Sequence, residues 1–277
     1  MAVKDAAGRW YVVKIGGDLI APGKLRGVAE GVSALQQAGA RVVIVHGGGP
    51  QANALTERLG LERKQVAGRR ITDESVLQVV KQAIAGEAGT DLAALLRAEG
   101  LRVLSSSGVS GGLVDAVKRP PTRFQGGPEA PVDLGFVGDV VGVNEPLLEA
   151  IVEAVYVPAL ASLGGDAQGG VWNINADTFA MSLATRLRAA GLFLISNVPG
   201  VLRDPTDPST RIPRITQAEA DRLIEAGVIT GGMIAKVQEA LEGVRRGIQA
   251  VHVCGFGPGQ FLAEATQPGS AGTVFSA

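Results

Sequence analysis

The sequence predicts an α/β protein with a mostly parallel sheet that helices cover on both faces. Short runs of aliphatic residues alternate along the chain with longer amphipathic segments, as in repeated strand–helix units. Glycine is abundant, at 39 of 277 residues, and aromatic residues make up only 4% of the chain. The chain is 46% hydrophobic and 19% charged, so it can form one large domain or two lobes that share a sheet.

Composition and charge exclude several classes of protein. The 26 basic and 27 acidic residues give a net charge of −1, so bulk charge gives no support for nucleic-acid binding. The single cysteine, Cys254, excludes an internal disulfide framework and a multi-cysteine metal site. No apolar run approaches the length of a membrane span, and the charged N-terminus is no signal peptide. We therefore expect a cytoplasmic protein with no membrane partner.

The first predicted strand, residues 11–15, contains a lysine near its end. Lys14 stands shortly before the glycine pair Gly16-Gly17. One interpretation is a lysine on an edge strand that extends its ammonium group to water. The other is a cation held at the carboxyl end of an inner strand, where open α/β sheets bind ligands.

Residues 42–50 are the stretch around which we expect the chain to be organised. Four aliphatic residues predict a short buried strand, and three glycines and Pro50, which fits the start of a helix, follow His46. Such a turn exposes backbone N–H groups, and the helix N-terminus behind it favours negative charge. A tight turn without a ligand is the alternative. Three successive glycines, each costing roughly 0.5–1 kcal/mol of chain entropy, favour anion binding.

Periodicity, caps and turn residues predict the remaining elements. Further strands are expected at about 101–105, 136–143, 156–160, 192–196 and, as the final inner strand, 251–253. Helices are expected at about 23–38, 50–60, 72–85, 91–98, 146–154, 176–190, from 216 onward, and 233–246. Residues 106–135, rich in glycine, proline and charge, predict hairpins or exposed loops. Glycine pairs at 164–165 and 169–170 predict a boundary between an N-lobe, 1–165, and a C-lobe, 166–277.

Several common catalytic motifs are absent from the sequence. There is no Gly-x-x-x-x-Gly-Lys-Ser/Thr, no Gly-x-Gly-x-x-Gly after the early strands and no Gly-x-Ser-x-Gly. Two lysines beside glycine pairs remain: Lys14, and Lys236 after Gly231-Gly232. A cation in the first turn of a helix costs about 0.3–1 kcal/mol, unless a bound anion such as a polyphosphate neutralises it. A solvated lysine is the alternative at each position.

Six motifs, in this order and spacing, resemble the amino acid kinase family, and within it the kinases that act on N-acetyl-L-glutamate. They are Lys14-Ile15-Gly16-Gly17, His46-Gly47-Gly48-Gly49-Pro50, Gly68-Arg69-Arg70-Ile71-Thr72, Val171-Trp172-Asn173-Ile174-Asn175-Ala176-Asp177, Asn197-Val198-Pro199-Gly200-Val201 and Gly231-Gly232-Met233-Ile234-Ala235-Lys236. The resemblance implies a three-layer α-β-α sandwich of the carbamate kinase-like type, with an acid-binding N-lobe and an ATP-binding C-lobe. The implied reaction transfers the γ-phosphoryl group of ATP to the side-chain carboxylate, a step of arginine biosynthesis.

The resemblance also implies roles for individual residues. Lys14 and Lys236 would neutralise the transferring group from opposite sides, and Asp177 would hold both ammonium groups in place. The residues implied in acceptor binding are Gly48 and Gly49 through their N–H groups, Arg70 at the α-carboxylate, and Asn173 at the amide and main carboxyl group. Those implied in nucleotide binding are Gly16, Gly17, Asn197, Val198, Pro199, Gly200, Val201, Leu202, Val228, Ile229 and Thr230. Mg²⁺ would be held mainly by phosphate and water, with no protein ligand set.

Two alternatives to this function stay open. Asn197 stands where many N-acetylglutamate kinases have aspartate, and related kinases acting on a carrier-protein-bound aminoadipate or glutamate can have asparagine there. An acidic carrier protein would be the partner of such an enzyme. A non-catalytic nucleotide or amino-acid sensor on the same fold is the other alternative, although a binder needs no transition-state cations. Arginine-inhibited family members have an additional N-terminal helix that this chain leaves no room for before Tyr11, so we expect a homodimer without arginine feedback.

Overall fold

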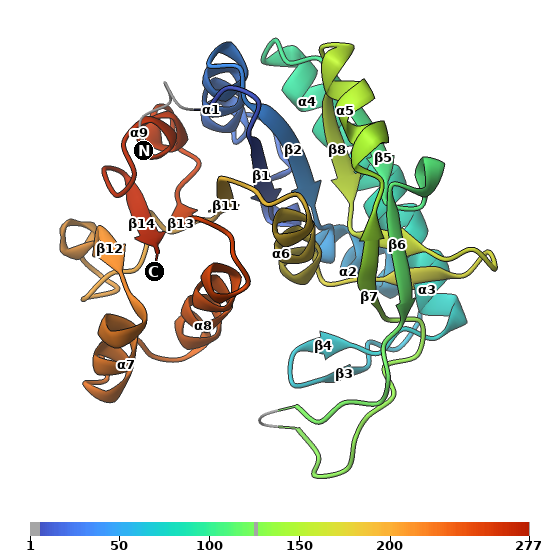
Figure 1. The fold of residues 1–277 in the computed structure, drawn as a ribbon. Coiled ribbons are helices and arrows are strands. Elements are labelled where there is room, and N and C mark those ends of the chain that lie inside the picture. The colour runs from blue at the N-terminus through green and yellow to red at the C-terminus, as the bar shows by residue number, and fades with distance from the viewer. Residues whose placement is uncertain (1–5, 125–126, 277) are drawn as a thin grey trace.

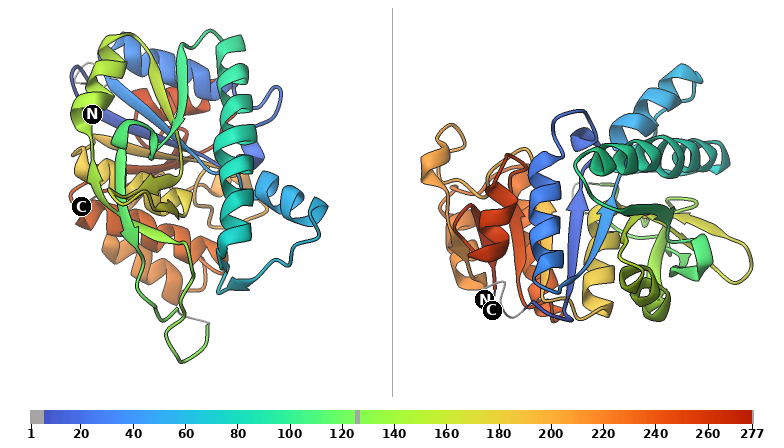
Figure 2. Two further views of the ribbon diagram at one scale, coloured as in Figure 1. Left: turned by 90° about the vertical axis from the view of Figure 1, so that its right-hand side faces the viewer. Right: turned by 90° about the horizontal axis from the view of Figure 1, so that it is seen from above.

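The computed structural model describes residues 6–124 and 127–276, and these form three layers (Figure 1). A central sheet of eight strands lies between helices on both of its faces (Figure 2). The strand order is β12-β14-β13-β11-β1-β2-β8-β5, and only the β13–β14 pair is antiparallel. The predicted α/β class with a mainly parallel sheet is therefore confirmed. In the part of the chain that the structure describes, no helix is long and apolar enough to cross a membrane.

The bounds of the elements are as follows. The strands of the central sheet are β1 (Trp10–Ile15), β2 (Arg41–His46), β5 (Val103–Ser107), β8 (Val157–Ala161), β11 (Gly191–Ile195), β12 (Arg214–Ile215), β13 (Val251–Cys254) and β14 (Gly272–Phe275). A second sheet, in the order β10-β9-β6-β7, comprises β6 (Val114–Lys118), β7 (Gly138–Val143), β9 (Leu163–Gly165) and β10 (Val171–Asn173), and β3 (Gln65–Val66) pairs with β4 (Arg69–Arg70). The helices are α1 (Arg26–Gln37), α2 (Gly49–Arg58), α3 (Glu74–Val80), the π-helical η3 (Lys81–Ala88), α4 (Gly89–Ala98), α5 (Glu145–Glu153), α6 (Ala176–Arg186), α7 (Gln217–Glu225), α8 (Gly232–Arg245) and α9 (Gln260–Thr266), with short 3₁₀ turns η2 (Gly17–Leu19), η4 (Ser110–Gly112) and η5 (Pro208–Thr210).

Alternation along β1 explains how the core is divided between the two faces of the sheet. Tyr11, Val13 and Ile15 pack in one hydrophobic cluster with residues of α1, α4 and α9. Val12 packs in a second cluster, with residues of α5, α6, α7 and α8. Lys14 has the same parity as Val12, so its side chain points toward the face that α6 covers.

The long helical rod from α3 to α4 differs from the prediction. Separate helices at 72–85 and 91–98 were expected, but α3, η3 and α4 run on without a break (teal in Figure 2). Asp73 caps its start by accepting a hydrogen bond from the Val76 amide at 2.9 Å. Gly89 keeps helical angles (φ −66°, ψ −40°), so it does not end the helix. A π-helical segment is common near functional sites, and η3 packs beside the glycine turn after β2.

The structure corrects one further strand prediction and places two other segments. The expectation that 251–253 is the final inner strand is wrong, because β14 follows α9, pairs antiparallel with β13 and lies between β13 and β12. The predicted lobe boundary at 165/166 falls within the β9–β10 hairpin, where Gly165 pairs with Val171. Residues 106–135, expected as hairpins or exposed loops, contain β6, which agrees with that expectation by pairing antiparallel with β7 in the second sheet.

Candidate active site

Lys14 lies at the carboxyl end of an inner strand, between β11 and β2, so the edge-strand interpretation is wrong. Its Nζ lies 2.9 Å from Oδ1 of Asp177, in the first turn of α6. Asn175 fixes the start of that helix by accepting hydrogen bonds from the Asp177 and Thr178 amides at 3.0 and 3.1 Å. The sheet alternation and the helix cap together therefore bring the cation and the carboxylate into contact.

Lys236 approaches the same carboxylate from α8. It is the fifth residue of this helix, beyond the first turn in which it was expected. Its Nζ donates a hydrogen bond to Oγ of Ser196, just after β11, at 3.1 Å. Burial lowers the pKa of Lys236, the Asp177 carboxylate opposes this shift, and the Lys14 ammonium group adds to it. Lys14, Asp177 and Lys236 thus form one electrostatic cluster, although they come from distant parts of the chain.

Two glycine turns follow β1 and β2 and pack against each other. Because Ile15 pairs with His46 in the sheet, both turns leave the sheet at the same edge. A Cβ atom at Gly17 would lie 2.8 Å from Cα of Gly48, so only glycine allows this approach. Helix α2 begins at Gly49, which puts Pro50 at the second helical position. The Gly48 and Gly49 amides have no hydrogen-bond partner among the residues that the structure describes, and they are available to an anion.

A cleft of about 820 Å³ lies in front of the glycine turns. The predicted residues that line it are Lys14, Gly16, Gly17, Gly48, Gly49, Arg70 and Asn173. The Arg70 guanidinium donates to Oδ1 of Asn53 on α2, and burial, with the nearby charge of Arg63, lowers the pKa of Arg70. Asn173 donates from Nδ2 to Oγ1 of the fully buried Thr72 at 3.0 Å. Both side chains are therefore held in place by protein groups at the cleft.

Of the residues predicted for nucleotide binding, Gly16 and Gly17 line the cleft, whereas most of the others do not. Asn197 follows β11 and donates from Nδ2 to the carboxylate of Asp18, which joins the turns after β11 and β1. Val201 and Ile229 bury their side chains in the core, so only their main chains could contact a nucleotide. The segments 198–202 and 228–230 line neither this cleft nor the cavity beside it.

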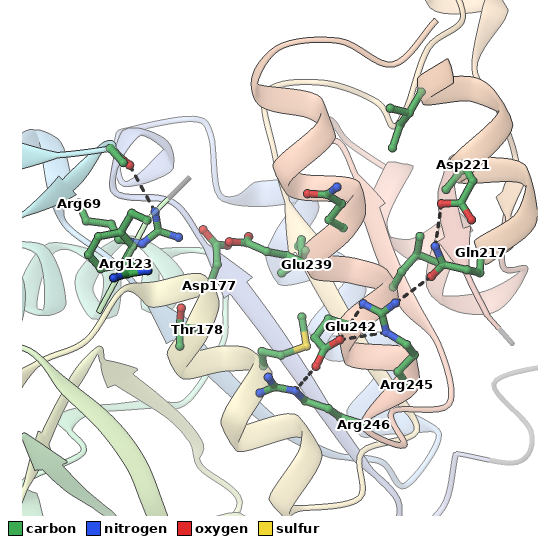
Figure 3. A pocket seen from close by; sticks show the side chains of 18 residues that line it. Arg69, Arg123, Asp177, Thr178, Gln217, Asp221, Glu239, Glu242, Arg245 and Arg246 are labelled. Carbon is green, nitrogen blue, oxygen red and sulfur yellow. Dashed lines mark hydrogen bonds and ion pairs between the residues drawn. The ribbon is translucent and has the colours of Figure 1, made fainter. Parts of the chain in front are cut away.

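A second cavity, of about 740 Å³, adjoins the cleft between α6, α7 and α8 (Figure 3). Arg69, Arg123, Phe124 and Glu239 line both spaces and mark the passage between them. The guanidinium of Arg69 stacks over the ring of Phe124 at 4.7 Å. Figure 3 shows the carboxylates of Asp177 and Glu239 extending toward one another. Burial and the Asp177 charge raise the pKa of Glu239.

Sequence reasoning missed several residues that the structure places around this site. They are Asp18, Asn53, Thr72, Ser196 and Glu239. Glu239 had a usable signal, because it stands three residues after Lys236 and so lies on the same helix face. Thr72 closes one of the six family motifs, but its contact with Asn173 had no local signal, because the contact joins segments that are 101 residues apart.

The donor set of the site suits a polyphosphate more than a metal held by protein alone. The Lys14 ammonium group and the free amides of Gly48 and Gly49 offer positive potential at the cleft. Lys236, which does not line the cleft, adds a second cation behind it and donates to Ser196. No group of three or more His, Cys, Asp or Glu side chains that could hold a metal ion occurs within 6–124 and 127–276.

Comparison with known proteins identifies the class to which this fold and site belong. Residues 9–255 match the amino acid kinase family, so the chain belongs to that family. The acetylglutamate kinase of Anaeromyxobacter dehalogenans is 51% identical over 264 residues, which cover 95% of this chain and 98% of that protein. The crystal structure of smu.665 from Streptococcus mutans matches with a TM-score of 0.75 and 30% identity, covering 97% and 98% of the two chains. Carbamate kinase from Giardia lamblia shares the fold, with a TM-score of 0.62 at 16% identity over 98% and 99% of the chains. The predicted carbamate kinase-like sandwich is thereby confirmed.

Proposed function

We propose that this chain is an acetylglutamate kinase, which transfers the γ-phosphoryl group of ATP to the side-chain carboxylate of N-acetyl-L-glutamate in arginine biosynthesis. The observation that carries the proposal is the Lys14–Asp177 ion pair of 2.9 Å, with Lys236 beside it and the glycine-lined cleft in front. The similarity to a protein of that name, at 51% identity over nearly its whole length, supports the choice of acceptor.

The chemistry asks for positioning and charge neutralisation. A carboxylate oxygen of the acceptor forms a bond to the γ-phosphorus, the bond to the β–γ bridging oxygen breaks, and ADP leaves with the electron pair. Negative charge on the transferring group meets the ammonium groups of Lys14 and Lys236. The negative charge of Asp177 offsets the repulsion between these two cations, so they can stay close together. Free amides of Gly48 and Gly49 face the same group, as in an oxyanion hole.

The acceptor would be held by residues that already have fixed orientations. Arg70 would bind the α-carboxylate in bidentate fashion, since Asn53 holds its guanidinium at the cleft. Asn173 would hydrogen-bond the substrate amide and main carboxyl group, with Thr72 as its anchor. A substrate that lacks an α-carboxylate or an amide would leave Arg70 or Asn173 unpaired, so these two residues favour an N-acylated amino acid with a free carboxylate.

The nucleotide would lie along the C-terminal part of the site. Gly16 and Gly17 would admit its phosphates, and the segments 197–202 and 228–230 would contact it mainly through the backbone. Mg²⁺ would be bound chiefly by phosphate oxygens and water, and it would offset phosphate charge during transfer. The division into an acceptor-binding part, 1–165, and a nucleotide-binding part, 166–277, belongs to the same proposal, as do the homodimer and the cytoplasmic location.

One assay separates this function from its two alternatives. Hydroxylamine traps an acyl phosphate as a hydroxamate, so the purified protein is incubated with MgATP, hydroxylamine and free N-acetyl-L-glutamate. We expect hydroxamate formation with the free acid. Turnover only with a carrier-protein-bound acid would indicate the carrier-dependent kinase, and no turnover with either, despite ATP binding, would indicate a sensor.

A further inference from the structure

His46 is a buried polar side chain to which the proposed mechanism gives no role. It is the last residue of β2 and its side chain is fully buried. Alternation with Ile44 directs the ring to the sheet face that α4 covers. Gly89 starts that helix, and a Cβ atom there would lie 3.5 Å from Nε2 of His46.

The hydrogen bonding of the ring is one-sided. Nδ1 lies 2.9 Å from the carbonyl oxygen of Gly47, and because a carbonyl oxygen only accepts, Nδ1 carries the hydrogen. Burial lowers the pKa of His46, which favours the neutral ring. Nε2 is then a bare acceptor, and it has no partner among the described residues. An unpaired buried nitrogen costs free energy that an apolar side chain would not. The bond from Nδ1 is the feature that an apolar residue could not supply.

That bond fixes the orientation of one peptide group. The described chain has no cis peptide bond, so the C=O of Gly47 and the N–H of Gly48 point in opposite directions. With the carbonyl group turned toward His46, the Gly48 amide points away from the buried ring. Gly47 and Gly48 both line the cleft, and the Gly48 amide has no protein partner within the described residues. Glycines have few conformational preferences, so without this bond the orientation of the peptide has fewer constraints.

The π-helical turn supports the same peptide from the other side. A Cβ atom at Gly48 would lie 3.0 Å from Cγ1 of Ile84 and 3.3 Å from Cβ of Ala88, both in η3. The amide of Gly47 is also held, because it donates to the carbonyl oxygen of Ile15 at 3.2 Å.

We infer that His46 is a positioning residue, whose Nδ1–H holds the Gly47–Gly48 peptide so that the Gly48 N–H faces the transferring phosphoryl group. The inference rests on the proposed function, since it concerns the same glycine cradle. In this inference Nδ1 orients the peptide, and Nε2 has no part in orienting it.

Two substitutions separate the two ring nitrogens. The Nδ2 group of His46→Asn can donate from about the position of Nδ1, whereas His46→Gln places its amide near the position of Nε2; His46→Leu supplies no donor. We expect His46→Asn to stay within about fivefold of the wild-type kcat. His46→Gln and His46→Leu should lose about tenfold to a hundredfold in kcat, less than deletion of an oxyanion donor costs. KM for MgATP should stay within about twofold in all three variants, because the loss falls on the transition state.

A binding readout and a structural readout make the test independent of turnover. Binding of MgADP alone should be unchanged, which also shows that each variant is folded, whereas binding of MgADP with tetrafluoroaluminate and N-acetyl-L-glutamate should weaken in step with kcat. Crystal structures should show the Gly47 carbonyl group turned away in His46→Gln and kept in His46→Asn. Equal activity and the same peptide orientation in these two variants would overturn the inference. A wild-type protein that forms no hydroxamate would instead contradict the proposed function, and the peptide orientation would still decide the role of His46.

Discussion

At the scale of single residues, the proposed phosphoryl transfer depends on three charged side chains. Lys14 and Asp177 form an ion pair whose side chains are 15% and 35% exposed, and Lys236 adds a second cation. Water screens the charges of a partly buried pair less than those of a surface pair, so each charge depends more on its neighbouring charges. Loss of the Asp177 carboxylate would leave the ammonium groups of Lys14 and Lys236 close together without the negative charge that lies between them.

Asp177→Asn is therefore expected to lower kcat by about a hundredfold or more, in line with the loss of one oriented electrostatic group. KM for either substrate should change much less, because the ammonium groups act mainly on the transition state. Initial rates from the hydroxamate assay measure both constants. Asp221→Asn, on α7 in the neighbouring cavity, is the matched control and should keep wild-type turnover. A near-wild-type rate in Asp177→Asn would contradict the assignment.

The alkaline side of the pH profile should report Lys236. Burial lowers the pKa of Lys236 below its ordinary value of 10.5, so this lysine loses its charge at a lower pH than a solvated lysine. In the proposed mechanism the charged form of Lys236 is the active one, and kcat/KM for MgATP should therefore fall as pH rises through that lowered pKa. In Lys236→Arg the guanidinium stays protonated, and the alkaline fall should move to higher pH whatever the cost in absolute rate. An unchanged alkaline limb in this variant would assign the titration to another group.

At the scale of elements, the glycine turns and the rod α3–η3–α4 shape the cleft. β1 and β2 are neighbours, so the turns that follow them meet, and their contact is backbone against side-chain-free backbone. Sequence patterns predicted both turns, since glycine runs after aliphatic runs are local signals. The sequence patterns did not predict that the rod would continue through Gly89, or that its π-helical turn would pack against Gly48. That packing depends on segments that are distant in the chain.

Two glycine-to-alanine variants test this packing. In Gly17→Ala the new Cβ would lie 2.8 Å from Cα of Gly48, so the two turns must move apart, and we expect at least a tenfold fall in kcat with lower thermal stability. In Gly49→Ala no atom lies within 4 Å of the new Cβ, so the melting temperature should stay near that of the wild type. Calorimetry and initial rates measure the two effects. Equal losses of stability in both variants would show that close approach at Gly17 is not the cause.

Glu264 ties α9 to β13 and β14, the elements that lie beyond the last predicted strand. It accepts hydrogen bonds from the Gly269, Ala271 and Gly272 amides, and one from His252 Nδ1 at 2.7 Å. Burial raises the pKa of Glu264, but the bonds from His252 and these amides outweigh burial and hold the pKa below its usual 4.5. The carboxylate thus stabilises the fold above the pKa of the unfolded chain, and this contribution is lost as pH falls through the lowered folded value.

Glu264→Gln should accordingly lower the free energy of unfolding by roughly 3–5 kcal/mol near neutral pH, because a neutral amide replaces a buried carboxylate whose hydrogen bonds each contribute about 1.5–3 kcal/mol. The variant should also lose less stability than the wild type between neutral pH and about pH 4. Urea unfolding at several pH values measures both. His252→Phe is the control: it keeps the amide bonds to Glu264, and a loss of about 1–3 kcal/mol is expected. A larger loss in the control than in Glu264→Gln would contradict this account.

At the scale of the whole molecule, apolar side chains are exposed along one edge of the central sheet. Leu104 lies on the edge strand β5 and is 43% exposed, and Val155 and Tyr156, just before β8, are 59% and 37% exposed. Exposed apolar groups that cluster in this way are typical of interaction surfaces. They support the proposed homodimer, in which the N-terminal part carries the contact.

Sedimentation equilibrium should therefore give a mass of twice the 28.3 kDa of one chain. Leu104→Glu places a charge on this edge and should shift the mass toward that of a monomer, because an unpaired charge is costly to bury. Lys64→Glu, at an exposed position away from this edge, should leave the mass unchanged. A wild-type monomer at micromolar concentration would contradict the proposal, and a dimer insensitive to Leu104→Glu would place the contact elsewhere.

The sequence by itself determined the class of fold, the two glycine turns and the lysines beside them, because strand alternation, glycine runs and helix caps act over a few neighbouring residues. The caps at Asp73, Asn175 and Thr216 are of this local kind. The contact of Lys14 with Asp177 across 163 positions of the chain was implied by the family resemblance but by no local pattern, and the tertiary structure shows it. Only the tertiary structure shows that Thr72 anchors Asn173 and that His46 turns its ring toward the Gly47 carbonyl group. These contacts depend on the order in which strands pair and on the depth at which helices pack, and neither quantity has a signal in short stretches of sequence.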